Sequence, residues 1–126
     1  MIVINMPGGG VEHVEGKEIL WFRKAFQNEW DGATMVRLSA RRIYSRESVD
    51  ELTAKFQAAG VKLVAFTPPD YPIHIPVNAG TVRQVKIADP AHYGPLARSI
   101  LEFFGGALLA VKEDPAVARG MLGLDD

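Results

Sequence analysis

Hydrophobic and polar residues alternate over several short stretches, which predicts a chain built mainly of β-strands. Single strands are expected at 1–5, 11–15, 61–66 and 81–87. The stretches 34–39 and 42–46 also alternate and are separated by Ala40-Arg41, so they predict a hairpin. A second hairpin is expected from 99–104 and 107–112, because Gly105-Gly106 supplies a tight turn between them.

The stretch from Lys17 to Phe26 is rich in large apolar residues and suits either a helix or a strand. A strand is favoured because Ile19 to Phe22 is an unbroken run of β-forming residues and no helix cap precedes it. The charged pairs Lys17-Glu18 and Arg23-Lys24 suit a helix equally well, so both alternatives stay open.

Two helices are expected. Ser48 and Glu51 form a capping box, in which each side chain accepts the backbone N–H of the other residue. One apolar stripe follows at Val49, Leu52, Phe56 and Ala59, and Gly60 is the expected end. Asp114-Pro115 begins the second helix as a cap followed by proline. Its expected apolar stripe is Val117, Met121 and Leu124.

Proline and glycine mark the connections. Pro7 and the three glycines after it predict a turn, since glycine accepts positive φ. The segment 67–72 holds three prolines, which lack an N–H, so it is expected along a surface or sheet edge. A short extended piece is expected at 73–75, before Pro76. The segment 89–95 is expected to be an irregular loop.

The halves 1–60 and 61–126 resemble each other in the class of their apolar residues. A spacing of 63 residues separates Val14 from Val77, and the same spacing relates Ile19 and Phe22 to Val82 and Val85. A spacing of 65 relates 34–38 to 99–103, and Leu52 and Phe56 to Val117 and Met121. Duplication of a β-β-β-α unit and chance similarity both explain this pattern. With duplication, each half is expected to cover the other's apolar sheet face around a pseudo-twofold axis.

The predicted fold class is therefore α+β, with a mainly antiparallel sheet, two helices and a single domain over 1–126. The 126 residues are 48% hydrophobic and 23% charged, as in ordinary globular domains. The absence of cysteine excludes disulfides, thiolate nucleophiles and cysteine metal sites. The apolar start lacks a basic leader and no apolar run could span a bilayer, so a cytoplasmic protein without a membrane partner is expected.

Residues 76–115 resemble small bacterial flagellar proteins of the FlbD type. The resemblance lies in the stretches Pro76-Val77-Asn78-Ala79-Gly80-Thr81-Val82-Arg83-Gln84-Val85, Ser99-Ile100-Leu101-Glu102-Phe103-Phe104-Gly105-Gly106 and Val111-Lys112-Glu113-Asp114-Pro115. Residues 19–56 resemble, more loosely, part of a LytTR-type DNA-binding domain. The N-terminal half and the proline-rich connector depart from the flagellar pattern, and the near-neutral charge departs from the DNA-binding one. Neither resemblance implies catalysis, and no functional residue is carried over from either family.

A basic sheet face is the first candidate site. In the first predicted hairpin, four side chains can project away from the apolar face: Arg37, Arg42, Tyr44 and Arg46. Arginines interleaved with an aromatic ring can contact phosphates and stack on bases, which would make a nucleic-acid-binding regulator. The alternative is a solvated face paired with Glu29, Asp31 and Glu47. This alternative is favoured because residues 1–60 hold eight basic and eight acidic side chains.

The second candidate site is the loop that carries Asp89, His92 and Tyr93, which could bind a small ligand or substrate in a pocket. A solvated loop is the favoured alternative. No pair of histidines has metal-ligand spacing, and no serine lies in a nucleophile motif. No catalytic residue, metal site or cofactor is therefore expected.

Large apolar residues exceed what one face of a small sheet can bury. Phe103 and Phe104 are adjacent, so in a strand they point to opposite sides. A second copy could cover the surplus, which predicts a homodimer. The leading functional expectation is a bacterial-type cytoplasmic, non-catalytic interaction or regulatory module that binds itself or another protein.

Overall fold

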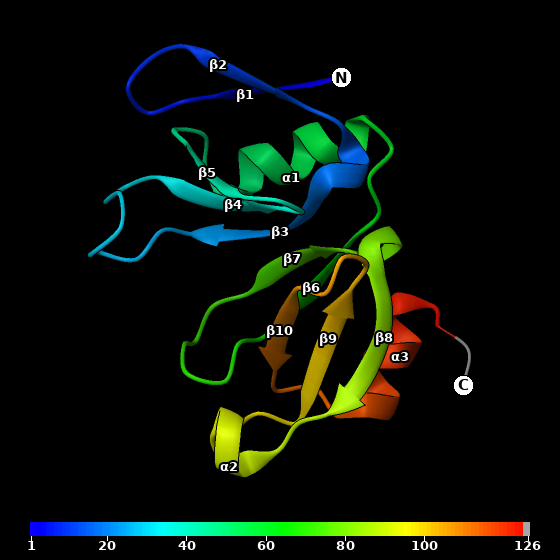
Figure 1. Cartoon of the computed structure of the whole chain (residues 1–126). Helices are drawn as coiled ribbons and strands as arrows, with labels where there is room; N and C mark the ends of the chain where they lie inside the picture. Colours follow the sequence, from blue (N-terminus) through cyan, green and yellow to red (C-terminus); the bar gives the residue numbers. More distant parts are fainter. Residues whose placement is uncertain (125–126) are drawn as a thin grey trace.

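In the computed structural model, which describes residues 1–124, the chain is an α+β protein with antiparallel sheets (Figure 1). The first half contains β1 (Ile2–Asn5), β2 (Val11–Val14), the 3-10 helix η1 (Gly16–Glu18), β3 (Ile19–Lys24), β4 (Thr34–Leu38), β5 (Arg42–Ser45) and α1 (Val49–Ala58). The second half contains β6 (Leu63–Phe66), β7 (Ile75–Asn78), the 3-10 helix η2 (Ala79–Thr81), β8 (Val82–Ile87), α2 (Pro90–Tyr93), β9 (Ser99–Phe103), β10 (Leu108–Val111) and α3 (Pro115–Leu122).

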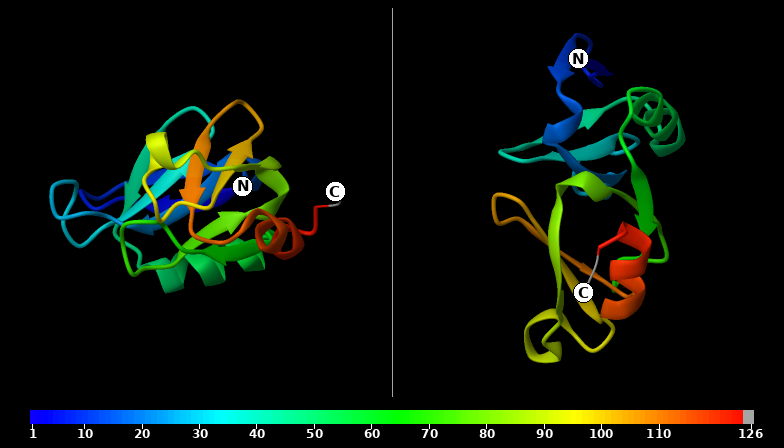
Figure 2. Two further views of the ribbon diagram at one scale, coloured as in Figure 1. Left: turned by 90° about the horizontal axis from the view of Figure 1, so that it is seen from below. Right: turned by 90° about the vertical axis from the view of Figure 1, so that its right-hand side faces the viewer.

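The strands form three sheets, and one of them crosses the boundary between the halves. Strands β1 and β2 form a two-stranded sheet, and β10-β9-β8 is the order of a three-stranded sheet. The third sheet has the order β5-β4-β3-β7-β6, so the β6–β7 hairpin of the second half extends the sheet of the first half at β3. Figure 2 shows the halves one above the other, with α1 and α3 on the same side.

The same order of elements occurs in both halves: a hairpin, a 3-10 helix, three strands and a helix. The register irregularity between Ile19 and Trp21 in β3 has a counterpart between Val82 and Gln84 in β8, at the spacing of 63 residues found in the sequence. The main difference is α2, which lies between β8 and β9 in the second half only.

Each half has its own hydrophobic core. The first core joins β1 and β2 to the sheet and α1, and the rings of Phe22 and Phe56 meet edge to face at 5.1 Å. The second core joins β6 and β7 to β8, β9, β10 and α3. Leu20 and Trp21 of the first half pack against the second core. Each half thus covers its sheet mainly with its own hairpin and helix, and the prediction that each half covers the other's sheet face is wrong.

Several local predictions are confirmed. Lys17 to Phe26 contains strand β3, and η1 precedes it. Ser48 Oγ accepts the Glu51 N–H at 3.1 Å and Glu51 accepts the Ser48 N–H, so the capping box forms. Gly60 ends the α1 region with a φ of 90°, a conformation that L side chains rarely adopt.

Two loop predictions are wrong. Pro76 lies inside β7 instead of after an extended piece, and it is paired with Ala65 of β6. Proline has no N–H to donate to a neighbouring strand. Strand β7 tolerates it because β7 is only briefly paired with β3, through the single partner pair Trp21 with Val77. The expected irregular loop 89–95 contains helix α2, because Asp89 accepts the Ala91 N–H as a cap and Pro90 suits the first turn.

The apolar stripe of the second helix was placed one residue too early. Ala118 and Leu122 are buried in the core, whereas Val117 is 52% exposed and Met121 is only partly buried. The cause lies in the hairpin before the helix. Thr34 pairs with Ser45, eleven positions on, but Ser99 pairs with Val111, twelve positions on. The second hairpin is therefore one residue longer, so every later residue of the first half corresponds to the residue 66 positions on, and not 65.

Candidate functional site

The predicted basic face lies on β4 and β5. Arg37 pairs with Arg42 and Met35 pairs with Tyr44, so these side chains share one face of the sheet. Val36 and Ile43 point the other way into the first core. Arg46 follows β5 and is exposed. The sequence therefore correctly predicted that Arg37, Arg42 and Tyr44 share this face. The binding of nucleic acid stays a prediction.

A carboxylate occupies this face. Glu29 lies in the loop after β3, and its Oε1 accepts hydrogen bonds from Arg23 Nη1 at 2.7 Å and from the Phe26 N–H at 2.8 Å. Its Oε2 accepts from the Tyr44 hydroxyl at 3.1 Å and lies 3.6 Å from Arg42 Nη1. The side chain is only 12% exposed. The hydrogen bond from Arg23 lowers the pKa of Glu29 from 4.5 to about 2, against the effect of burial.

Glu29 also organises the groups around it. The Arg23 guanidinium carbon lies 3.7 Å from the centre of the Phe26 ring, a cation–π contact, and Arg23 itself is buried. Burial and the Glu29 carboxylate together raise the pKa of Tyr44. Arg42 and Tyr44, two of the four candidate residues, are therefore held by an anion of the chain, as the solvated-face alternative expected for Glu29.

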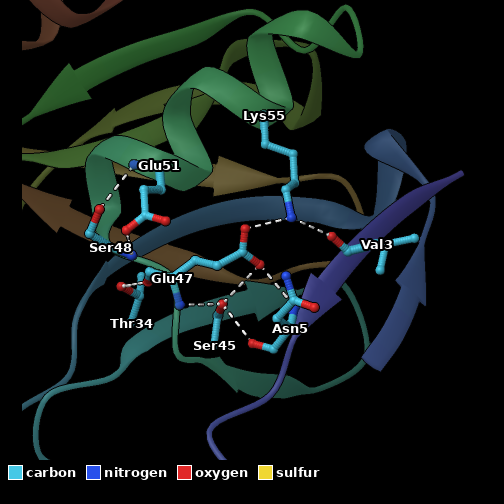
Figure 3. A network of polar contacts seen from close by, with 8 residues as sticks. All are labelled: Val3, Asn5, Thr34, Ser45, Glu47, Ser48, Glu51 and Lys55. Carbon is cyan, nitrogen blue, oxygen red and sulfur yellow. Dashed lines mark hydrogen bonds and ion pairs between the residues drawn. The ribbon is translucent and has the colours of Figure 1, made fainter. Parts of the chain in front are cut away.

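Glu47 does not pair with the basic face. Figure 3 shows its carboxylate between the N-terminal hairpin and α1, where Oε1 accepts the Asn5 N–H at 2.8 Å and Oε2 lies 2.5 Å from Lys55 Nζ. Thr34 Oγ1 donates to the Glu47 carbonyl at 2.7 Å. Burial alone would raise the pKa of Glu47, but the bonds from Asn5 and Lys55 outweigh it and lower the pKa. The residue is a structural clamp.

The second half contains the same clamp. Glu113 accepts the Thr67 N–H at 3.1 Å, and Ser99 Oγ donates to the Glu113 carbonyl at 2.6 Å. Glu47 and Glu113 each precede the cap residue of a helix, Ser48 and Asp114. One signal in the sequence could have revealed both clamps. In each half a glutamate lies directly before a helix cap, and a hydroxyl residue, Thr34 or Ser99, begins the strand β4 or β9.

The loop candidates Asp89, His92 and Tyr93 lie on or beside α2, and all three are exposed. Asp89 Oδ2 and His92 Nδ1 are 2.7 Å apart, and this contact lowers the pKa of Asp89. A hollow of about 330 Å³ lies nearby. Its lining residues include Ile87 at the end of β8, Arg98 just before β9 and Asp114 just before α3. The structure brings the three candidates together without placing them in that hollow.

Within residues 1–124, no group of three or more histidine, aspartate or glutamate side chains is arranged to hold a metal ion. None of the helices in this part of the chain has the length and apolar character needed to span a bilayer.

Comparison with known proteins gives no relative: no family model, curated protein or solved structure matches the chain.

Proposed function

We propose that this protein is a cytoplasmic, non-catalytic interaction module that self-associates, with the β1–β2 hairpin of one copy adding to strand β8 of another. The observation that carries the proposal is the joint inside the chain, where the β6–β7 hairpin adds to β3. Addition of a strand to an exposed sheet edge is a common mode of protein recognition.

The proposed joint uses β2 and β8, the two strands that correspond to β7 and β3 but take no part in the internal joint. Strand β8 ends the three-stranded sheet, and within residues 1–124 β2 pairs only with β1. Strands β2 and β8 stand in the same positions in the element order as β7 and β3. An unpaired edge offers backbone donors and acceptors to another strand.

The register of the internal joint fixes the register of the proposed one. Trp21 lies opposite Val77, and the 63-residue spacing converts this pair into Gln84 opposite Val14 of a second copy. Antiparallel pairing then sets Lys86 opposite Glu12 and Arg83 near Glu15. Both cations would face carboxylates of the second copy, and the side chains of Arg83 and Lys86 are more than half exposed, with their ion pairs to Glu102 at 3.8 and 2.7 Å. Glu12 is paired with Arg41 of its own copy, so the joint would exchange or share these ion pairs. The proposed joint is therefore complementary in charge.

The proposed joint is more polar than the internal one. Leu20 and Trp21, which pack into the second core, correspond to Arg83 and Gln84. One β8 acceptor is already engaged, since Arg119 Nη2 donates to the Val85 carbonyl at 3.2 Å. Less apolar burial and more ion pairing make the association weak and sensitive to salt. Two such joints formed reciprocally would close a dimer.

We also propose that the two halves derive from duplication of one unit. The repeated element order, the matching strand irregularities and the Glu47 and Glu113 clamps support this origin. A duplicated unit explains why one chain carries both an internal joint and the parts for another.

The test is analytical ultracentrifugation over a wide concentration range, at low and at high salt. We expect concentration-dependent association at low salt that weakens at high salt. Lys86→Glu should weaken it, and the double variant Lys86→Glu with Glu12→Lys should restore it. Lys112→Glu is the control, since it makes the same charge change on an exposed residue elsewhere. A monomer at every concentration would refute self-association, and association indifferent to the charge swap would refute this joint.

A further inference from the structure

A hollow with a volume of about 620 Å³ lies at the seam between the halves. One wall comes from η1 and from the connector between α1 and β6. The other comes from η2 and the turn between β9 and β10. Small-molecule sites in proteins commonly have volumes of about 300–1,000 Å³ and lie between structural units.

Hydrogen bonds between the halves hold these walls in place. Asn78 Nδ2 donates to the Gly16 carbonyl at 3.1 Å and to the Ile19 carbonyl at 2.9 Å, while its Oδ1 accepts the Gly80 N–H at 3.1 Å. Within the second half, the Ala79 N–H donates to the Lys62 carbonyl at 2.9 Å, which ties η2 to the connector between α1 and β6. The hollow is therefore formed before any ligand arrives, which reduces the entropy cost of binding.

The lining combines positive charge with apolar surface. Lys17 and Lys62 are the charged side chains among the described residues that line the hollow, and no carboxylate lines it. Leu20 and Val61 supply apolar wall, and Phe104 at the rim is 61% exposed.

We propose that this seam hollow binds a small organic anion with an apolar or aromatic body. The lysines attract the anionic head through charge, and the body packs against Phe104 at the rim, since apolar burial supplies most of the binding free energy. Because such a ligand touches both halves, it stabilises the folded chain by mass action. This site is independent of the strand joint proposed above, which uses β2 and β8.

The probe for the test is anilinonaphthalene sulfonate, whose fluorescence rises in an apolar site. We expect saturable binding with one site per chain and displacement by decanoate. The double variant Lys17→Gln with Lys62→Gln should bind about tenfold more weakly, in line with two exposed ion pairs. Phe104→Ser should also weaken binding. All three residues reach the surface at the hollow, so circular dichroism should show folded variants.

Two controls separate this site from general apolar stickiness. Lys24→Gln with Lys112→Gln removes two exposed lysines that do not line the hollow, and it should bind the probe like the natural chain. Phenylnaphthylamine, an uncharged analogue, should bind more weakly than the sulfonate. Unsaturable fluorescence, or equal binding by the Lys17→Gln with Lys62→Gln variant, would overturn the proposal.

Discussion

The carboxylate of Glu47 accepts the backbone N–H of Asn5 at 2.8 Å, so the residue before the α1 cap holds the end of the first strand. Lys55 reaches the same carboxylate from α1 and donates to the Val3 carbonyl at 2.8 Å. The N-terminal hairpin is thereby fixed to the helix of its own half. Glu113 and Thr67 repeat the relationship in the second half.

Glu47→Ala should lower the free energy of unfolding by about 2 kcal/mol, because a partly buried N–H loses its acceptor. Glu47→Gln should cost less, since an amide oxygen can still accept the Asn5 N–H. Urea denaturation followed by circular dichroism measures both values. Gln57→Ala on the exposed side of α1 is the control. Equal stability of Glu47→Ala and the natural chain would show that the clamp is unimportant.

Much of this architecture could be predicted from local sequence, because strands and caps are specified by neighbouring residues. The capping box at Ser48 and the glycine turn at Gly105 are examples. The addition of β7 to β3 could not be predicted, because Trp21 and Val77 are far apart in sequence and no local period encodes their pairing. Pro76 even argued against a strand there.

In the candidate sites, too, the features set by neighbouring residues could be predicted and those set by distant residues could not. Alternation correctly placed Arg37, Arg42 and Tyr44 on one face, since strand periodicity is local. The sequence named Glu29, Asp31 and Glu47 as possible partners of the basic face but could not single out Glu29. The position of the Glu29 carboxylate depends on the conformation of a loop, which strand periodicity does not predict. The seam hollow was missed altogether, since its walls come from five separate segments of the chain.

Stability should fall with acid through Glu29. Its pKa in the folded chain is about 2 against an ordinary value of 4.5, so the carboxylate stabilises the fold fully above pH 4.5. This contribution disappears as the pH falls from 4.5 toward 2. Its upper limit is about 3 kcal/mol, which solvent screening reduces.

The Glu29→Gln variant isolates this effect. The difference in unfolding free energy between the natural chain and the variant should be largest near neutral pH and shrink toward pH 2, as measured by urea denaturation at several pH values. Asp31→Asn in the same loop is exposed and serves as the control. A difference that stays constant with pH would contradict the lowered pKa.

Asn78 should be among the most sensitive polar positions, because its amide donates to two backbone carbonyls of the first half. Asn78→Asp keeps the acceptor for the Gly80 N–H but sets a carboxylate against those carbonyls, so it should cost about 2–4 kcal/mol of stability. Glu15→Asn is the matched control, since Glu15 precedes η1 as Asn78 precedes η2. Similar urea midpoints for Asn78→Asp and Glu15→Asn would show that the seam bonds contribute little.

The nucleic-acid alternative makes its own prediction at the basic face. Glu29 holds Arg23 and Arg42, and residues 1–60 carry no net charge, so we expect no retarded band with single-stranded RNA or duplex DNA in a low-salt gel shift. Binding through this face would instead give a salt-sensitive band that Arg42→Glu with Arg46→Glu abolishes and Lys112→Glu leaves intact. That result would overturn our assignment of Glu29 as the partner that holds Arg42, because the phosphates would then have taken the place of Glu29 at Arg42, whose side chain is 61% exposed.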